Sequence, residues 1–191
     1  MAELDPFSAL TTGIENRLRL FFLKKVWEFH VVPDPLSVEE FKSLVGTKTP
    51  MLALSWRQLN PTSGAGRRFT GNAGLRLTIA VKNPKRSLRF LGDVPGSGLY
   101  PAMAGAIALL NGFTVPGVGT LMVTACAQPY AEGFSDLTVA IATLDLSATI
   151  VIGDVTGDLS AAPDFLKIVS AFEPWPEDQD PDAPIDVRPA P

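Results

Sequence analysis

Apolar residues recur at helical spacing near the start of the chain. Asp5 suits a helix N-cap, and Pro6 then takes the favoured first-turn position. The apolar face of this predicted helix consists of residues three or four positions apart, which are Phe7, Leu10, Ile14, Leu18 and either Phe21 or Phe22. Lys24 and Lys25 suit the last turn, where cations offset the helix dipole. The pattern therefore predicts one helix that begins after Asp5 and ends at Lys25.

The next two apolar segments are shorter. WEFHVVPD, residues 27–34, has the composition of a strand that ends at Pro33. SVEEFKSLVG, residues 37–46, predicts a short helix, because Ser37 and Glu40 are spaced as a capping box and Gly46 suits a helix stop.

Alternating apolar and polar residues then predict two strands, residues 51–59 (MLALSWRQL) and 75–82 (LRLTIAVK), joined as a hairpin. Their connection includes NPTSGAGRRFTGN, residues 60–72, which is longer than a hairpin needs. Arg67 and Arg68 make this connection basic. We expect the extra length either to serve a function or to be mobile.

Residues 83–98, NPKRSLRFLGDVPGSG, predict a second basic loop. LYPAMAGAIALLNGF then predicts a helix with small residues on much of its surface, and residues 118–127 and 136–152 predict two more strands. This order of elements indicates an α+β fold, with a mostly antiparallel sheet, helices packed on one face and an extended C-terminal tail.

The composition changes near the C-terminus. Residues 173–191 contain six prolines, six carboxylates and one arginine, a charge of −5, whereas the whole chain of 191 residues has a net charge of −4. Such an acidic, proline-rich segment buries too little apolar surface to offset its chain entropy. We therefore expect an α+β domain over residues 1–155 and a C-terminal extension over residues 156–191. Trp175 in this extension is a candidate anchor on a neighbour, and packing on its own domain is the alternative.

Candidate catalytic groups are few. Cys126 lies in an apolar run that favours a small buried side chain, and no pattern brings His30, the single histidine, close to it. The glycine-rich segments SGAGRR and PGSG lack the strand-to-helix context of a phosphate loop. GDVTGD lacks the glycine and the distal glutamate of a calcium loop. Glu132 and Asp136 flank a predicted hairpin turn, and Asp145 lies within a predicted strand. We interpret them as solvated turn and edge residues and not as an acid–base pair.

The sequence therefore predicts no enzyme, no cofactor and no metal site. It also contains no apolar run near the roughly 18 residues that span a bilayer. The N-terminus begins acidic, unlike a signal peptide. We expect a soluble protein that is made in a cytoplasm.

Several segments and the order of the elements resemble the tail-terminator proteins of long-tailed bacteriophages, in particular those of Mu-like phages. The matching stretches are IENRLRLFF, MLALSWRQLNP, LRLTIAVKNP, GLYPAMAGAIALLNGF and the last pair of strands. The resemblance implies a six-membered ring that caps the completed tail tube, ends its polymerisation and offers a surface for head joining. It also implies a structural protein of the virion tail or neck, assembled in the host cytoplasm, without catalysis, cofactor or membrane.

The partners implied by this resemblance are further copies of the chain, the tail-tube protein and the head–tail connector protein. Double-stranded DNA would pass through the lumen without sequence-specific binding. Candidate residues for a partner or the lumen are Arg67, Arg68, Lys85, Arg86 and Arg89. Two adjacent arginines without an aromatic run favour contact over base readout, and the alternative is that they only aid solubility. Alternatives for the whole chain are a head-completion or connector protein, a tail-tube subunit, or a non-viral soluble binding domain.

Overall fold

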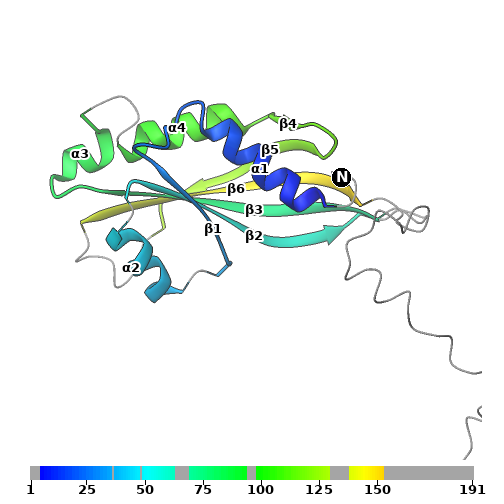
Figure 1. The fold of residues 1–191 in the computed structure, drawn as a ribbon, viewed down its shortest axis with the longest axis horizontal. Helices are drawn as coiled ribbons and strands as arrows, with labels where there is room; N and C mark the ends of the chain where they lie inside the picture. Colours follow the sequence, from blue (N-terminus) through cyan, green and yellow to red (C-terminus); the bar gives the residue numbers. More distant parts are fainter. Residues whose placement is uncertain are drawn as a thin grey trace, which may run out of the picture. The chain divides into compact units, whose positions relative to one another are not determined.

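The computed structural model describes residues 5–35, 37–47, 49–62, 69–93, 98–129 and 138–152. Within these ranges the helices are α1 (Pro6–Leu18), α2 (Val38–Thr47), α3 (Arg86–Leu91) and α4 (Leu99–Leu110). The strands are β1 (Glu28–Val32), β2 (Met51–Pro61), β3 (Phe69–Lys82), β4 (Thr114–Val115), β5 (Gly119–Ala127) and β6 (Val139–Ile152). The predicted α+β class is confirmed (Figure 1).

The strands form one six-stranded sheet in the order β1-β2-β3-β6-β5-β4. Only β1 and β2 run parallel, and every other neighbouring pair is antiparallel, as the sequence predicted. The two central strands pair along their full length, from Phe69 opposite Ile152 to Lys82 opposite Val139. This long pair fixes the register to which the outer strands are added.

One face of the sheet carries the main core. Alternate residues of β3 and β6 point to this face, and the buried positions of α1 and α4 pack on them. In α1 these positions are Leu10, Ile14 and Leu18, which are fully buried at the predicted spacing. In α4 they include Ala102 and Ala106, whose small side chains let the helix approach the sheet closely.

The opposite face carries a smaller core at one end of the sheet. Phe41 and Val45 of α2 pack there with Met51 of β2 and Ala80 of β3. Helices on a single face were expected, and this holds for α1 and α4, whereas α2 lies on the other side (Figure 1). The reason is that residues 51–54 of β2 are apolar on both faces of the strand, so both faces must be covered.

Local signals at the helix starts are confirmed. The backbone N–H of Ser8 donates to the Asp5 carboxylate at 3.0 Å, and hydrogen bonds with Ser8 lower the pKa of Asp5. Ser37 and Glu40 form the predicted capping box, in which the Glu40 N–H donates to Ser37 Oγ at 3.2 Å. The Ser37 N–H in turn donates to the Glu40 carboxylate at 3.3 Å.

Three boundaries differ from the sequence-based prediction. Helix α1 ends at Leu18, and residues 19–27 form turns that lead into β1, so Lys24 and Lys25 lie outside the helix. Both ends of the predicted long connection, residues 60–61 and 69–72, are strand, because β2 continues to Pro61 and β3 begins at Phe69. Residues 63–68 lie outside the described residues. The predicted second loop contains the six-residue helix α3. The predicted C-terminal extension, residues 156–191, lies outside the described residues.

Among the described helices, none is both long and apolar enough to cross a membrane.

Candidate functional site

The structure brings some of the predicted contact residues together. Lys85 precedes the first turn of α3, and Arg86 and Arg89 lie within it. The Arg89 guanidinium Nε donates to the backbone carbonyl of Asn83 at 2.9 Å, so Arg89 holds the start of the segment in place. Lys85 and Arg86 are exposed and remain available for a partner. The basic cluster is therefore a short helix, where a loop was predicted.

The other predicted contact residues lie outside the described part of the chain. These are Arg67, Arg68 and Trp175. The same holds for Glu132, Asp136 and the GDVTGD segment. Their proposed roles stay predictions.

A charged cluster that the sequence did not reveal lies on the sheet face opposite α1 and α4. Arg76 of β3 donates from Nε to Asp145 Oδ1 of β6 at 2.8 Å and from Nη2 to Oδ2 at 3.2 Å. Arg57 of β2 lies between two carboxylates, with Nε 2.9 Å from Asp34 Oδ2 and Nη1 3.5 Å from Asp145 Oδ1. The Arg76 hydrogen bond lowers the pKa of Asp145, and Asp145 raises the pKa of Arg76.

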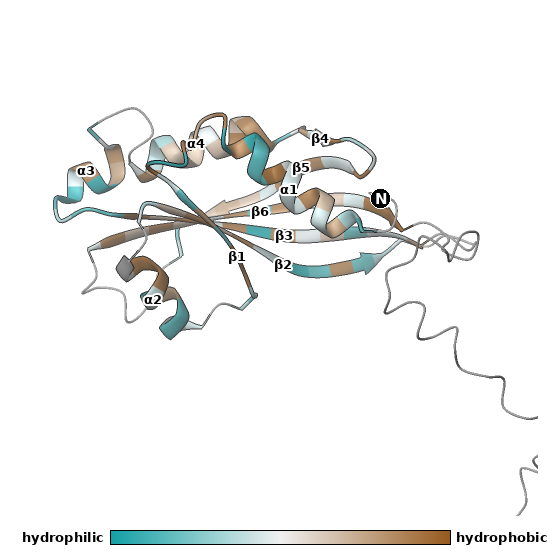
Figure 2. Ribbon diagram, in the orientation of Figure 1, coloured by the Kyte–Doolittle hydropathy of each residue, from teal (hydrophilic) through white to brown (hydrophobic). Residues whose placement is uncertain are grey.

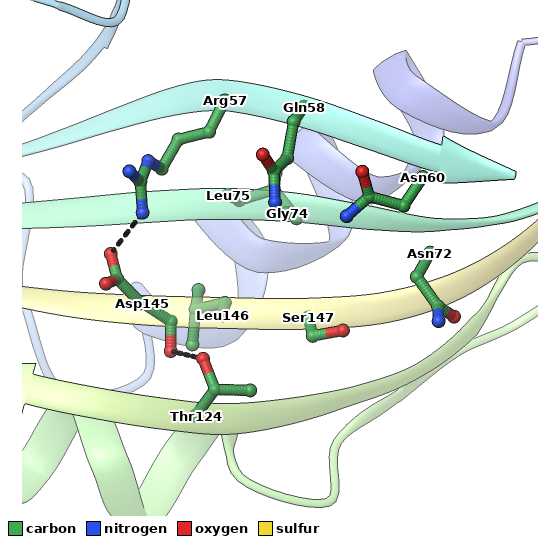
Figure 3. Close-up of a pocket in the computed structure, with 10 residues that line it drawn as sticks. All are labelled: Arg57, Gln58, Asn60, Asn72, Gly74, Leu75, Thr124, Asp145, Leu146 and Ser147. Atoms are coloured by element: carbon green, nitrogen blue, oxygen red, sulfur yellow. Dashed lines mark hydrogen bonds and ion pairs between the residues drawn. The ribbon is translucent and has the colours of Figure 1, made fainter.

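The charged cluster borders a shallow polar pocket of about 240 Å³ on the same face (Figure 3). Amides and hydroxyls line much of it, including Gln58, Asn60, Asn72 and Ser147. Two arginines and two aspartates balance each other, so the cluster offers no net charge to attract a phosphate or a metal ion. The arrangement suits hydrogen bonding to a polar surface and stiffening of the sheet.

Polar residues at alternate positions of β2, β3 and β6 were the only sequence signal for this face. Arg76 and Asp145 are 69 positions apart, and only the strand register places them opposite each other. Asp145 lies within a strand, as predicted, but the expectation of an edge position is wrong, because β6 is a central strand.

The thiol and the imidazole do not form a catalytic pair. Cys126 lies on β5 and His30 on β1, four strand spacings apart, which is about 19 Å. The predicted burial of Cys126 is wrong, because the residue is exposed near the end of β5. Partial loss of solvent contact raises the pKa of its thiol, which disfavours the reactive thiolate. Within the described ranges, no group of three His, Cys, Asp or Glu residues could hold a metal ion.

The two edges of the sheet differ, and each has a part that no described residue covers. The outer edge of β5 is covered over its first half. Strand β4 pairs at Gly119 and Thr120, the backbones of Gly112 and Phe113 bond to Leu121, and the Asn111 side chain accepts from the Val123 N–H. Residues Thr124–Ala127 are exposed. No charged residue or proline occurs in β5, whose sequence is GTLMVTACA. At the other edge, β2 is the sole partner of β1 among the described strands, and Val31 is 66% exposed. Edge strands of monomeric proteins are normally guarded by charge, proline or cover.

Comparison of the chain with protein-family models finds no match, and comparison with curated proteins finds no significant match.

Proposed function

We propose that the chain is a structural subunit of a long-tailed bacteriophage, which forms a six-membered ring at the end of the tail tube. The ring stops addition of further tube subunits and presents a surface for the head–tail connector. In this proposal the protein resides in the tail or neck of the virion, and double-stranded DNA passes through the ring. Its role is structural, without catalysis or cofactor.

The observation that carries the proposal is the exposed end of β5, Thr124–Ala127, which no described residue covers as an edge strand. An exposed strand without charge or proline is a template for pairing with another chain. In a protein that functions in an assembly, the partner covers this edge. A further copy of the same chain is the simplest such partner.

The two unlike edges favour a ring over a two-fold dimer. A two-fold contact places the same surface of both copies together, whereas a head-to-tail contact joins two different surfaces and closes into a ring. At one edge, β5 pairs antiparallel with β6 and contains no charged residue. At the other edge, β1 pairs parallel with β2 and contains Glu28. This difference supports contact between the β5 edge of one copy and a different surface of the next.

The element order also supports the proposal. The resemblance to tail terminators rests on a helix, a strand, a helix, a hairpin, a helix and a final antiparallel pair. The structure has this order, with α3 and the two-residue β4 as additions. The proposal that the assembly is a tail-terminator ring rests on the resemblance. The exposed strand edges give a physical reason why the subunits would oligomerise.

The mass of the purified protein in solution tests the proposal, measured by light scattering after size exclusion. We expect a discrete species near six times the subunit mass of 20.4 kDa, alone or after addition of purified tail-tube protein. Heterogeneous long polymers would favour a tail-tube subunit. A monomer that stays monomeric with tube protein present would favour a soluble binding domain and overturn the proposal. A discrete ring that binds a portal or connector but not the tube would indicate a head-completion protein.

A further inference from the structure

The uncovered parts of the two sheet edges lie at the same height, measured along the strands. The strand register, followed across β2 and β3, places Glu28 of β1 level with Ile141 of the central strand β6 and Val32 level with Asp145. The exposed end of β5 pairs with the same stretch of β6, because Ala125 lies opposite Asp145. The edge of β1 and the exposed end of β5 are therefore at opposite sides of the sheet but in the same rows of residues.

One of these rows runs across the sheet from edge to edge, with Val31 at one end and Cys126 at the other. Its members are Val31, Leu54, Leu77, Leu144 and Cys126. The three leucines belong to the main core, and residues in register on neighbouring strands point to the same face. Val31 and Cys126 therefore belong to the face that carries α1 and α4, and both are exposed.

The side chains along the two edges are compatible with pairing. No charged residue occurs in β5, which Figure 2 draws in white and brown. In β1, Val31 is 66% exposed, and a large exposed β-branched residue is typical of a strand that is covered by a neighbour. Glu28, the one carboxylate of β1, is level with Ile141. Ala127, the last residue of β5, is opposite Thr143, two positions further along β6, so the carboxylate would lie past the end of the paired stretch.

We propose that β1 of one copy pairs with the exposed end of β5 of the next copy, so that the sheets of neighbouring subunits become continuous. This inference rests on the proposed ring and names both surfaces that join its subunits. In the pair, Val31 of one copy lies beside Cys126 of the next, and the backbone groups at both edges gain hydrogen-bond partners.

Strand direction and register agree with this pairing. Three antiparallel pairs lead from β2 to β5, and β1 runs parallel to β2, so β5 runs opposite to β1. Rotation about a ring axis that follows the strands keeps both direction and height, so β1 of one copy meets β5 of the next antiparallel and at the same level. A shift by a single residue would turn core-facing side chains to the other face, so the sheet stays continuous only in this register or with an even shift.

Disulfide trapping in the full-length protein tests the inference, because Cys126 is the single cysteine of the chain. Val31→Cys adds a thiol at the other end of the row. Opposite residues on neighbouring strands have Cβ atoms about 4.5–5.5 Å apart, close to the separation that a disulfide needs. Oxidation of the assembled variant with copper phenanthroline should therefore link successive copies and give, on a non-reducing gel, a ladder that extends beyond the dimer.

Two controls make this ladder specific. Thr12→Cys adds an exposed thiol on α1 and should give no ladder. Val31→Cys combined with Cys126→Ser should lose the ladder, because the link needs both thiols. A short bismaleimide linker is used in parallel, since closure of a ring of strands staggers the register and can move the two thiols apart by one pair of residues.

A charged residue at the β1 edge gives a second test that does not depend on the thiols. Val31→Lys should fold and lose the species of higher mass in light scattering, because pairing would bury the charge. Val31→Thr is the matched control, since threonine is β-branched and uncharged, and it should keep the oligomer. Val31 is exposed, and circular dichroism verifies that both variants fold.

The outcomes separate this inference from the proposed function. If the ring forms, Val31→Cys gives the ladder and Val31→Lys prevents assembly, the inference is supported. If the ring forms but gives no ladder with either reagent, or survives Val31→Lys, the inference is wrong and the ring proposal stands. If the oxidised wild type gives only disulfide dimers through Cys126, two β5 ends pair about a two-fold axis, and both are wrong. If no oligomer forms, even with tube protein, both are also wrong.

Discussion

Arg76 on β3 and Asp145 on β6 face each other directly across the centre of the sheet, with Arg76 Nε 2.8 Å from Asp145 Oδ1. A second hydrogen bond, from Nη2 to Oδ2 at 3.2 Å, makes the pair bidentate. Such a pair gives both geometric specificity and energy, since the planar guanidinium matches the carboxylate. It stabilises the register of the two longest strands on the face that the helices α1 and α4 leave open.

We expect Asp145→Asn to lower the free energy of unfolding at pH 7 by about 1 kcal/mol, because the pair is partly exposed and screened by solvent. The pKa of Asp145 is lowered in the folded state, so its contribution is present above the unfolded pKa and is lost as the pH falls through the folded value. Urea unfolding at several pH values below about 5 should therefore show a smaller acid-induced loss in the variant than in the wild type. Glu39→Gln, an exposed position on α2, is the control. Parallel pH profiles for wild type and Asp145→Asn would contradict this prediction.

The capping box at the start of α2 gives a second prediction. Ser37→Ala removes the acceptor for the Glu40 N–H and the hydroxyl that donates to the Glu40 carboxylate at 2.8 Å. We expect a loss of about 1 kcal/mol in the free energy of unfolding. Ser87→Ala in α3 should change stability by less than about 0.5 kcal/mol, because Ser87 is exposed and makes no capping contact. Equal effects of the two substitutions in urea unfolding would argue against the cap.

The small residues of α4 give a third prediction, which uses two alanines that lie two positions apart. Ala106 is fully buried against the sheet, so Ala106→Leu should overpack the core and cost about 1–3 kcal/mol. Ala104 is exposed, and Ala104→Leu should leave the stability of the isolated subunit within about 0.5 kcal/mol of wild type. Thermal unfolding of both variants distinguishes them. A stable Ala106→Leu variant would mean that α4 does not pack closely on the sheet.

Short-range patterns predicted most of the helices and strands correctly. The alternation of residues 75–82 and the spacing of Leu10, Ile14 and Leu18 each report burial on one side of a local element. The sequence-based prediction of strands failed where a segment is held in the sheet by strands that are distant in sequence. FTGNAG, residues 69–74, has the composition of a loop, but it is strand because β2 and β6 pair with it on both sides. Its hydrogen bonds come from the two neighbours, which override the weak strand propensity of glycine and asparagine.

The candidate site was even harder to predict from the sequence, because its residues are distant from one another along the chain. The charged cluster of Asp34, Arg57, Arg76 and Asp145 comes from four separate segments of the chain. Each residue alone resembles an ordinary exposed charge, and only the strand order brings them together. The short helix α3 was missed because its six residues lie between Pro84 and Gly92, which are both typical of loops.

The exposed end of β5, Thr124–Ala127, gives the last prediction. Met122 and Ala125 are exposed on this strand, and lysine at both positions would place one charge within this end and one just before it. Charged residues at an edge oppose pairing with another chain, since pairing would bury them. We therefore expect M122K/A125K to fold as a monomer with a melting temperature close to that of wild type, and to lose the species of higher mass in light scattering. Thr12→Lys, on the exposed side of α1, adds a charge outside β5 and should keep the oligomer. An intact oligomer in M122K/A125K would show that the subunits join through another surface, and the edge of β5 would then no longer support the ring.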